Sequence, residues 1–344
     1  MNHKRNFLWA GLLVLATIWI LVRHNRILPY QNNQGKIFGT LYHITYQSDE
    51  DLHELIAAEL DRFDGSLSPF NDTAIITRVN RNEPVKADTF FARVFRRSME
   101  ISQQTDGAFD ITVAPLVNAW GFGFKQNAFP DSAIIDSLRT FTGYTKVKLS
   151  ADGRIVKEDP RIMLDCSAVA KGYSVDVIAT LLDKKGVKNY TIDIGGEVVV
   201  KGENPHKKPW RIGINKPVDD SLSLNQDLQT ILHVTNAGIA TSGNYRNFYY
   251  KGGKKYAHTI DPQTGYPVQH SILSATVIAR DCMSADAYAT AFMVMGLEKV
   301  KAFLAAHPEI EAYLIYADDS GKLQVFQTEK MKEMANMFQT ELCH

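Results

Sequence analysis

The sequence contains few cysteines and no excess of either charge. Among its 344 residues are three cysteines, Cys166, Cys282 and Cys343, with no Cys-x-x-Cys spacing. An odd number of widely spaced cysteines argues against a structural zinc site and a complete disulfide framework. Whether one pair forms a disulfide stays open. Lysine plus arginine equals aspartate plus glutamate, at 38 each. Without a basic surplus, we predict no nucleic-acid partner.

Two common nucleotide-binding motifs are also missing. No Walker A sequence occurs, and no Gly-x-Gly-x-x-Gly opens a helix after a predicted strand. Three shorter glycine-containing turns remain, at residues 170–172, 194–197 and 241–244. Glycines after a strand more often form a turn than a ligand cradle, because glycine supplies positive φ wherever the chain bends. Each turn alone is therefore weak support for a ligand site.

One long apolar run, FLWAGLLVLATIWILV, occupies residues 7–22 near the N-terminus. Lys4 and Arg5 precede it and Arg23 and Arg26 follow it, a pattern typical of an export signal. As a helix the run spans about 24 Å, which is short for a hydrocarbon core of about 30 Å. No small-residue cleavage site is evident after it, so an uncleaved signal-anchor over residues 1–30 is favoured over a cleaved signal peptide. We expect the chain at the bacterial inner membrane, with the remainder on the periplasmic side.

The rest of the chain reads as a mixed α+β domain. Residues 30–36 are polar and are predicted to form a short stalk, followed by a first strand in IFGTLYHITY. Runs of strands without regular βαβ alternation argue against a doubly wound parallel sheet. We predict one domain over residues 33–334 and a polar tail over residues 335–344. The clearest expected elements are helices near 167–186, 284–295 and 297–306, a strand at 161–166, strands across 190–234, a hairpin turning at 251–254, and two closing strands near 311–317 and 322–328.

A carboxylate and a hydroxyl share one face of a predicted helix. Asp286 and Thr290 are four residues apart in the helical pattern DAYATAFMVM, so both side chains project from the same side. This pair suits a hard cation, and Mg²⁺ often takes only one or two carboxylates together with waters and substrate phosphates. A polar stripe on a surface helix is the commoner explanation of the spacing alone.

Two further segments combine polar and aromatic side chains. His258 precedes Asp261-Pro262-Gln263-Thr264-Gly265, whose proline and glycine favour a tight loop that could fix a catalytic base. A packing role for His258 and a turn-forming role for Asp261 explain the same residues equally well. Residues 105–123 include Asp110 and Trp120, and could stack on an aromatic ligand or form an ordinary core loop.

Eight segments, taken in order, resemble the ApbE family of bacterial FAD:protein FMN transferases. They are FGTLYHITY (38–46), LSPFNDTAIITRVN (67–80), TDGAFDITVAPLVNAWGFG (105–123), LDCSAVAKGYSVD (164–176), IDIGGEVVVKG (192–202), ATSGNYRNF (240–248), HTIDPQTGYPV (258–268) and SADAYATAFMVMG (284–296). The resemblance implies a T-fold-like α+β catalytic domain that follows the signal-anchor helix. It also implies a reaction, in which the FMN moiety of FAD is transferred through a phosphodiester bond to a threonine or serine hydroxyl of a target protein and AMP is released.

The resemblance also implies roles for individual residues. Mg²⁺ is expected on Asp286, Thr290 and the backbone carbonyl of Ala170, with His258 as the general base and Lys171 on a phosphate oxygen. Asp176 is expected at a position on the face of its helix. The remaining predicted contacts to FAD are Tyr42, Asn71, Trp120, Tyr245, Gly195, Gly196, Glu197, Ser242, Gly243, Asp261 and again His258.

Two departures from the family pattern concern substrate affinity. Ser167 and Ala168 stand where many members have two glycines, and Glu197 stands where an aspartate is frequent. Two alternative functions share the same residues: an FAD pyrophosphatase that releases FMN and AMP, and a non-catalytic FAD-binding protein. The resemblance favours transfer, with an acceptor that is a subunit of a membrane electron-transfer complex.

Overall fold

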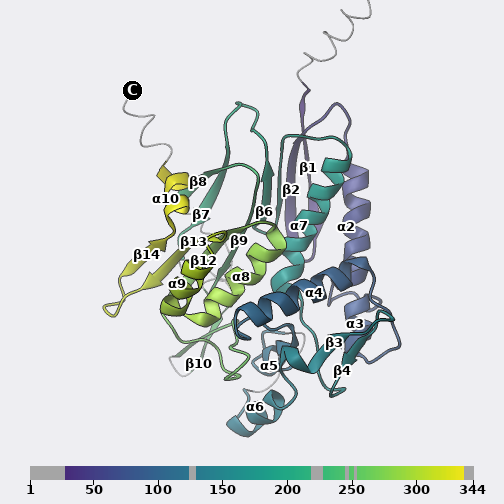
Figure 1. The fold of residues 1–344 in the computed structure, drawn as a ribbon, viewed down its shortest axis with the longest axis vertical. Coiled ribbons are helices and arrows are strands. Elements are labelled where there is room, and N and C mark those ends of the chain that lie inside the picture. Colours follow the sequence, from purple (N-terminus) through teal and green to yellow (C-terminus); the bar gives the residue numbers. More distant parts are fainter. Residues whose placement is uncertain (1–27, 124–128, 218–227, 245–247, 252–253, 337–344) are drawn as a thin grey trace, which may run out of the picture.

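The computed structural model describes residues 28–123, 129–217, 228–244, 248–251 and 254–336. Its centre is an antiparallel sheet of eight strands in the order β1-β2-β5-β6-β9-β12-β13-β14 (Figure 1). The strands are β1 Tyr30–Ile37, β2 Thr40–Gln47, β5 Tyr190–Ile194, β6 Glu197–Lys201, β9 Ala237–Gly243, β12 Ile272–Ala279, β13 Glu311–Ala317 and β14 Leu323–Gln327. The prediction of a mixed α+β fold without a doubly wound parallel sheet is confirmed.

The sheet begins earlier than the sequence predicted. The expected stalk is wrong, because these residues form most of β1, which pairs with β2 from Tyr30–Gln47 to Ile37–Thr40. Phe38 and Gly39 make the turn, with φ of 51° and 73°. β1 lies at the edge of the sheet, where polar side chains can face water. Polar composition alone therefore did not distinguish this strand from a stalk.

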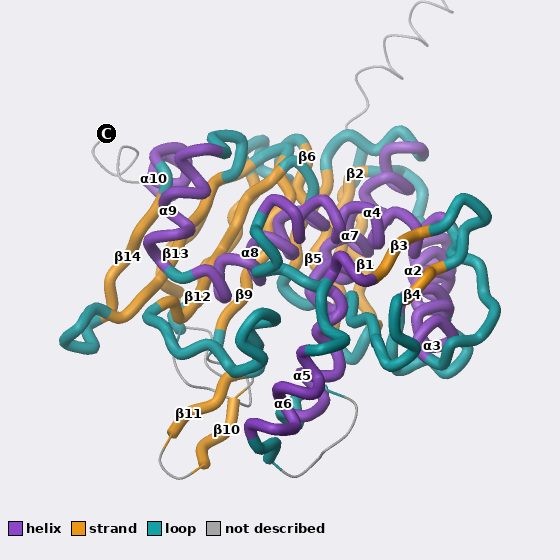
Figure 2. Tube along the Cα trace, turned by 60° about the horizontal axis from the view of Figure 1, so that its bottom comes forward, coloured by secondary structure: helices purple, strands orange, loops and turns teal. Residues whose placement is uncertain are grey.

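Five helices cover one face of the sheet. They are α2 His53–Leu67, α4 Thr89–Gln104, α7 Ser167–Lys184, α8 Cys282–Met295 and α9 Leu297–Ala306, and Figure 2 shows them as a layer in front of the strands. α7 and α8 pack on each other and on the middle strands. α8 is buried along almost its whole length, as expected for a helix that is apolar nearly all round. The three predicted helices near 167–186, 284–295 and 297–306 are confirmed.

The opposite face of the sheet is covered by a hairpin and a helix. The hairpin consists of β7 Trp210–Asn215 and β8 Leu228–Val234, and the helix is α10 Glu329–Asn336. Trp210 and Leu232 of the hairpin join Val198 and Ile239 of the sheet in one buried apolar cluster. This layer encloses the second face of the sheet, so the middle strands are buried on both sides.

One end of the molecule is built from short elements. They are α3 Ile75–Asn80, η1 Ile111–Val113, α5 Ala114–Ala119, α6 Ser132–Arg139, η2 Tyr144–Lys146, β3 Val147–Leu149, β4 Ile155–Lys157, β10 Phe248–Lys251 and β11 Lys254–Ala257. The predicted hairpin is confirmed, since Lys251 pairs with Lys254. The predicted strand at 161–166 is wrong. That segment is held instead by the Asn80 side chain, which exchanges hydrogen bonds of 2.9 and 2.7 Å with the backbone of Leu164.

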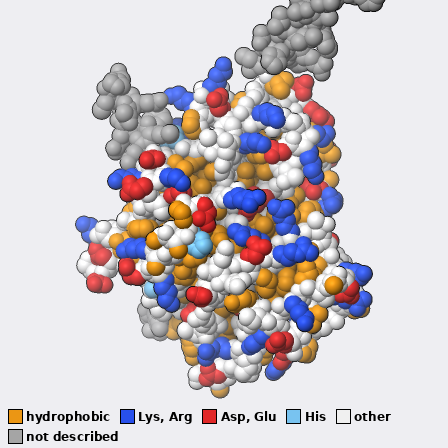
Figure 3. Space-filling model, viewed as in Figure 1, with side chains coloured by type: hydrophobic (Ala, Val, Ile, Leu, Met, Phe, Trp, Pro, Cys, Tyr) orange, Lys and Arg blue, Asp and Glu red, His pale blue; other side chains and the backbone are white. Residues whose placement is uncertain are grey.

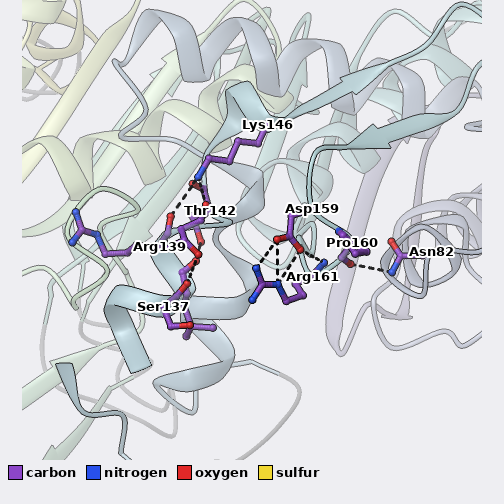
Figure 4. A network of polar contacts seen from close by, with 10 residues as sticks. Asn82, Ser137, Arg139, Thr142, Lys146, Asp159, Pro160 and Arg161 are labelled. Carbon is purple, nitrogen blue, oxygen red and sulfur yellow. Dashed lines mark hydrogen bonds and ion pairs between the residues drawn. The ribbon is translucent and has the colours of Figure 1, made fainter. Parts of the chain in front are cut away.

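Polar contacts between side chains and backbone stabilise this end (Figure 4). The Lys146 ammonium donates to the carbonyls of Thr140 and Thr142 at 2.6 and 2.9 Å, just after α6 ends. Arg139 Nε donates to the carbonyl of Gln263 at 2.8 Å. α6 is thereby fastened to the loop that follows His258.

Charged side chains of both signs are mixed on the surface, as expected from equal numbers of acidic and basic residues. Acidic and basic side chains are interspersed over the helical face in Figure 3. Cys166 and Cys282 are buried free thiols, and Cys343 lies outside the described residues. Within the described part of the chain, no helix has both the length and the apolar character needed to cross a membrane. The predicted signal-anchor, residues 1–30, lies almost entirely within residues 1–27, which are not described.

Candidate active site

A cavity of about 520 Å³ gathers residues from segments far apart in the sequence. It lies where the ends of β5, β6 and β9 meet the first turns of α7, the middle of α8 and the loop after β11. A volume of several hundred Å³ is typical of small-molecule sites. The predicted residues that line it are Lys171, Gly195, Gly196, Glu197, Ser242, Gly243, His258, Asp286 and Thr290.

Asp286 presents a buried carboxylate to this cavity. It is 4% exposed, and its Oδ2 accepts a hydrogen bond of 3.0 Å from the amide of Gly172 on α7. Its Oδ1 has no hydrogen-bond partner among the described residues. Burial raises the pKa of Asp286, and the nearby Lys171 ammonium partly counteracts this rise. A buried carboxylate with one oxygen turned to a cavity favours a bound cation.

Thr290 lies one turn further along α8 and also lines the cavity. Its hydroxyl is 3.1 Å from the hydroxyl of Ser242 at the end of β9. The explanation of Asp286 and Thr290 as a surface stripe is wrong, because both side chains face an internal cavity and Asp286 is buried.

The donors around Asp286 fit Mg²⁺. They are oxygens, one from a carboxylate and two from hydroxyls, and Mg²⁺ prefers oxygen ligands and commonly keeps several positions for water and phosphate. Among the described residues, no cluster of three or more His, Cys, Asp or Glu side chains could hold a metal ion. A site with a single carboxylate thus suits a cation that shares its ligands with a phosphate-bearing molecule. Ala170, the predicted backbone ligand, is buried and does not line the cavity, whereas Ala168 and Lys171 do; its role stays a prediction.

Lys171 and Glu197 form an ion pair within the cavity. Burial lowers the pKa of Lys171, but attraction to Glu197 and Asp286 outweighs it and the pKa is raised, so the ammonium stays charged. Burial raises the pKa of Glu197 to about 7 against the opposing effect of Lys171. Glu197 Oε2 is buried and has no hydrogen-bond partner in the described structure. The ion pair with Glu197 holds the positively charged Lys171 ammonium in a fixed place close to Asp286.

The glycines between β5 and β6 form a turn and also line the cavity. Gly195 and Gly196 connect β5 to β6 with φ of 66° and 97°, and a Cβ on Gly195 would lie 2.8 Å from Thr40 Cγ2. Both glycines also line the cavity, so the two interpretations of this turn are compatible. Ser167 and Ala168 line the cavity as well, at a kink in α7 where Ala168 has φ −87° and ψ 15°.

His258 lines the cavity from a tight loop, as predicted. Its ring meets Phe122 edge-on at 6.5 Å between centroids. Beyond it, Asp261 Oδ1 accepts hydrogen bonds from the amides of Gln263 and Thr264 at 2.8 and 3.4 Å. Asp261 itself does not line the cavity, and its assignment as an FAD contact stays a prediction. Its carboxylate shapes the loop, and Pro262 faces the cavity in its place.

Three other predicted contacts lie outside the cavity, each for a packing reason. Tyr42 is buried in the cluster beneath α2 and α7. The Asn71 amide donates to Asp64 at 2.8 Å, and its oxygen accepts from Thr73. Trp120 donates to the carbonyl of Gly265 at 2.8 Å and stacks on Tyr256. Tyr42, Asn71 and Trp120 thus do not line this cavity, and their assignment as FAD contacts stays a prediction. Tyr245 lies outside the described residues.

Several lining residues were not singled out from the sequence. Asp165 and Asn215 contribute polar groups, and Phe70, 79% exposed, lines the cavity from the loop before α3. Asn215 comes from the β7–β8 hairpin, whose position over the sheet depends on packing of the whole domain. Asp165 directly precedes Cys166 in a segment that was misread as a strand.

Asp176 is not on an exposed helix face. Its Oδ1 and Oδ2 accept hydrogen bonds of 3.0 and 2.8 Å from the backbone amides of Cys282 and Met283. These amides belong to the first turn of α8, whose N–H groups have no partner within their own helix. Asp176 thus lies on the face of α7 that α8 covers, which the predicted helix-face position did not specify.

Comparisons with known proteins relate this chain to one family. A sequence model of the ApbE family matches residues 38–314. The FAD:protein FMN transferase of Haemophilus influenzae is 32% identical over 328 residues, covering 91% of this chain and 94% of that protein. The Escherichia coli K12 protein of the same name is 36% identical over 281 residues, covering 78% and 79%.

Solved structures give the same relationship. The flavin transferase ApbE from Vibrio cholerae has a TM-score of 0.79 and 33% identity, and the match covers 89% of this chain and 99% of that chain. The apo flavinyl transferase ApbE of Pseudomonas stutzeri has a TM-score of 0.79 and 29% identity, covering 90% and 98%.

Proposed function

The chain belongs to the ApbE family, and from that premise we propose that it transfers the FMN moiety of FAD to a hydroxyl of another protein. The observation that carries the proposal is the cavity, where Asp286 and Thr290 of α8 meet Lys171 of α7 and His258 of the loop after β11. A cation-binding carboxylate, a fixed ammonium and a candidate base in one cavity are suited to phosphoryl-type chemistry.

The reaction exchanges the phosphoanhydride bond of the pyrophosphate for a phosphodiester bond to the acceptor. The acceptor hydroxyl oxygen attacks the phosphorus of the FMN half, and the bond from that phosphorus to the bridging oxygen of the pyrophosphate breaks. AMP leaves with the bonding electron pair, and the hydroxyl proton must go to a base. An alcohol is a weak nucleophile near neutral pH, so a positioned base accelerates this step. We assign that proton to the imidazole of His258.

The charged residues of the cavity bind and orient the pyrophosphate. Lys171, held by Glu197, places a positive charge near its oxygens. Asp286 and Thr290 would hold Mg²⁺, which when bound neutralises charge on the phosphates and on the departing AMP. Apolar side chains of Phe109, Val113 and Ile260 line the rest of the cavity and limit the access of water.

The same groups could direct water to the phosphorus, so hydrolysis of FAD is the alternative that must be separated from transfer. The joint placement of Asp286, Lys171 and His258 argues against simple storage of FAD, which needs no base or cation. As acceptor we propose a subunit of a membrane electron-transfer complex. The apolar run at residues 7–22 supports a location at the inner membrane, with the catalytic domain on the periplasmic side.

Mass spectrometry separates these functions. The purified chain is incubated with FAD, MgCl₂ and a solubilised candidate acceptor, and the acceptor and the nucleotides are both analysed. Transfer adds one FMN-phosphoryl group to a threonine or serine and releases one AMP. Matched controls replace FAD by FMN, which lacks the pyrophosphate, and replace the acceptor threonine by valine. AMP with free FMN and an unmodified acceptor would indicate hydrolysis, and no AMP at all would contradict both enzymatic functions.

A further inference from the structure

Helices α7 and α8 are joined at two points, and both points flank the candidate cation site. The first is the hydrogen bond from the Gly172 amide to Asp286 Oδ2. The second is the pair of hydrogen bonds that Asp176 accepts from Cys282 and Met283. Because the two contacts lie about one turn apart on each helix, together they restrict both sliding and rotation of α8 on α7.

The first contact is unusually close. A Cβ on Gly172 would lie 2.3 Å from the carbonyl oxygen of Cys282 and 2.8 Å from Asp286 Cβ. Only glycine permits this approach, so the backbone of α7 touches α8 at the turn that carries Asp286. A single contact of this kind sets the distance between the helices but leaves α8 able to tilt about it.

The second contact fixes the start of α8. The helix has its own N-cap, Asp281, whose carboxylate accepts from the Ser284 amide at 2.8 Å. Asp176 supplies a second carboxylate, from α7, for the two preceding amides. Of these two acids, only Asp176 connects the first turn of α8 to another helix. A carboxylate at a helix N-terminus is favoured by both the free amides and the helix dipole.

We propose that Asp176 is a positioning residue that holds the first turn of α8 against α7, so that Asp286 is presented correctly to the cation. This inference rests on the proposed function. Met283 precedes Asp286 by three residues, so a shift of the first turn is passed directly to the Asp286 carboxylate. Mg²⁺ demands near-octahedral ligands at 2.0–2.1 Å, and a displacement of a few tenths of an ångström weakens binding.

The test substitutes Asp176→Asn and measures Mg²⁺ binding by calorimetry at pH 8.5 with saturating FAD and no acceptor. Asparagine keeps the shape but offers one acceptor oxygen, and its NH₂ group faces the second amide. We expect the Mg²⁺ dissociation constant to rise about 10- to 100-fold, the range for residues that orient metal ligands. Binding of FAD without Mg²⁺, followed by flavin fluorescence, should remain native, and saturating Mg²⁺ should restore turnover.

A matched control is Asp131→Asn. Asp131 caps α6 by accepting from the Ile134 amide at 2.8 Å, so this substitution also removes a capping carboxylate, but away from α7 and α8. It should leave Mg²⁺ affinity unchanged. A folded Asp176→Asn protein with Mg²⁺ affinity within twofold of native would overturn the positioning role alone. If the native chain bound no Mg²⁺, the metal assignment of the proposed function would fail, and this inference with it.

A second measurement uses the native chain and does not depend on the variant folding. If the hydrogen bonds from the Cys282 and Met283 amides to Asp176 strengthen Mg²⁺ binding, bound Mg²⁺ must stabilise these hydrogen bonds by the same factor. Hydrogen exchange of the Cys282 and Met283 amides should therefore slow when Mg²⁺ is added in the presence of FAD. Exchange at these two amides that is insensitive to Mg²⁺ would contradict the inference.

Discussion

The Lys171 ammonium donates a hydrogen bond to Glu197 Oε1 and so joins the start of α7 to the start of β6 inside the cavity. Glu197 is 3% exposed, and a buried carboxylate is tolerated when it has a charged partner. The pair therefore has two consequences that can be measured separately. One is the stability of the fold, and the other is the charge offered to the substrate.

We predict that Lys171→Met lowers both stability and FAD affinity. Removing one partner leaves Glu197 buried and unpaired, at a cost of about 1–3 kcal/mol in the free energy of unfolding. The Michaelis constant for FAD should rise, because a charge for the pyrophosphate is lost. The double variant Lys171→Met with Glu197→Gln should recover stability in urea unfolding but not FAD affinity. Recovery of turnover in the double variant would show that Lys171 serves only as the partner of Glu197.

We predict that turnover requires Mg²⁺ bound through Asp286. Chelation should abolish turnover, and added Mg²⁺ should restore it. Asp286→Asn retains an oxygen for the Gly172 amide and should fold, yet the loss of the charge should weaken Mg²⁺ binding by more than the roughly 10- to 100-fold typical of residues behind the ligands. Asp183→Asn is the matched control, because Asp183 is an exposed residue of α7 that pairs with Lys201. Its Mg²⁺ binding and turnover should equal those of the native protein. Turnover that persists in the chelator would refute the metal assignment.

Stability should depend on pH through Asp176. Its pKa is raised to about 7, chiefly by burial and also by the nearby Asp281, against the opposing effect of the amides of Cys282 and Met283 and of Arg93 of α4. An unfolded aspartate has a pKa of about 3.9, so between pH 4 and 7 the folded chain binds more protons than the unfolded chain. This group therefore reduces the free energy of unfolding as pH rises through that window, and has no further effect above it.

The variant Asp176→Asn lacks this titration, and its stability relative to native should improve as pH rises from 5 to 8. Tyr173 of the same helix, Cys282 of α8 and Tyr190 of β5 also interact with Asp176 electrostatically, but all three ordinarily titrate above this window. Urea unfolding of both proteins at several pH values measures the difference. A difference that is constant with pH would show that Asp176 does not titrate as described.

Local patterns alone were not sufficient to predict this site. The helical period placed Asp286 and Thr290 on one face, and positive φ explained the glycines at 195 and 196, but these patterns favoured a surface stripe and an ordinary turn. The family resemblance assigned these residues to a ligand site. The contacts that Asp176 makes with α8 were not predicted, because the face of α7 that α8 covers is decided by tertiary packing. Aromatic composition at residues 105–123 left a ligand platform and a packed core loop as alternatives for Trp120, because composition does not distinguish them.

The errors in the fold have similar physical causes. β1 was missed because an edge strand can be polar, and the strand predicted at 161–166 failed because Asn80 satisfies the backbone there in place of a neighbouring strand. Long buried helices were predicted well, since their apolar character hardly depends on what covers them. Side-chain partners contributed by distant segments could not be derived from local patterns.

The sharpest prediction concerns His258. If its imidazole accepts the proton of the acceptor hydroxyl, His258→Ala should keep FAD and Mg²⁺ binding but lose transfer by roughly 10²- to 10⁴-fold, the usual range for a general base. The native rate should fall at acidic pH as the imidazole becomes protonated, and this fall should be absent from the residual rate of the variant. Phe122→Leu is a control variant, because it removes the ring that meets His258 edge-on while leaving the base in place. It should reduce the rate of transfer far less than His258→Ala does. Near-native transfer by His258→Ala would exclude the catalytic role, and a variant that folds but no longer binds FAD would assign His258 to substrate binding.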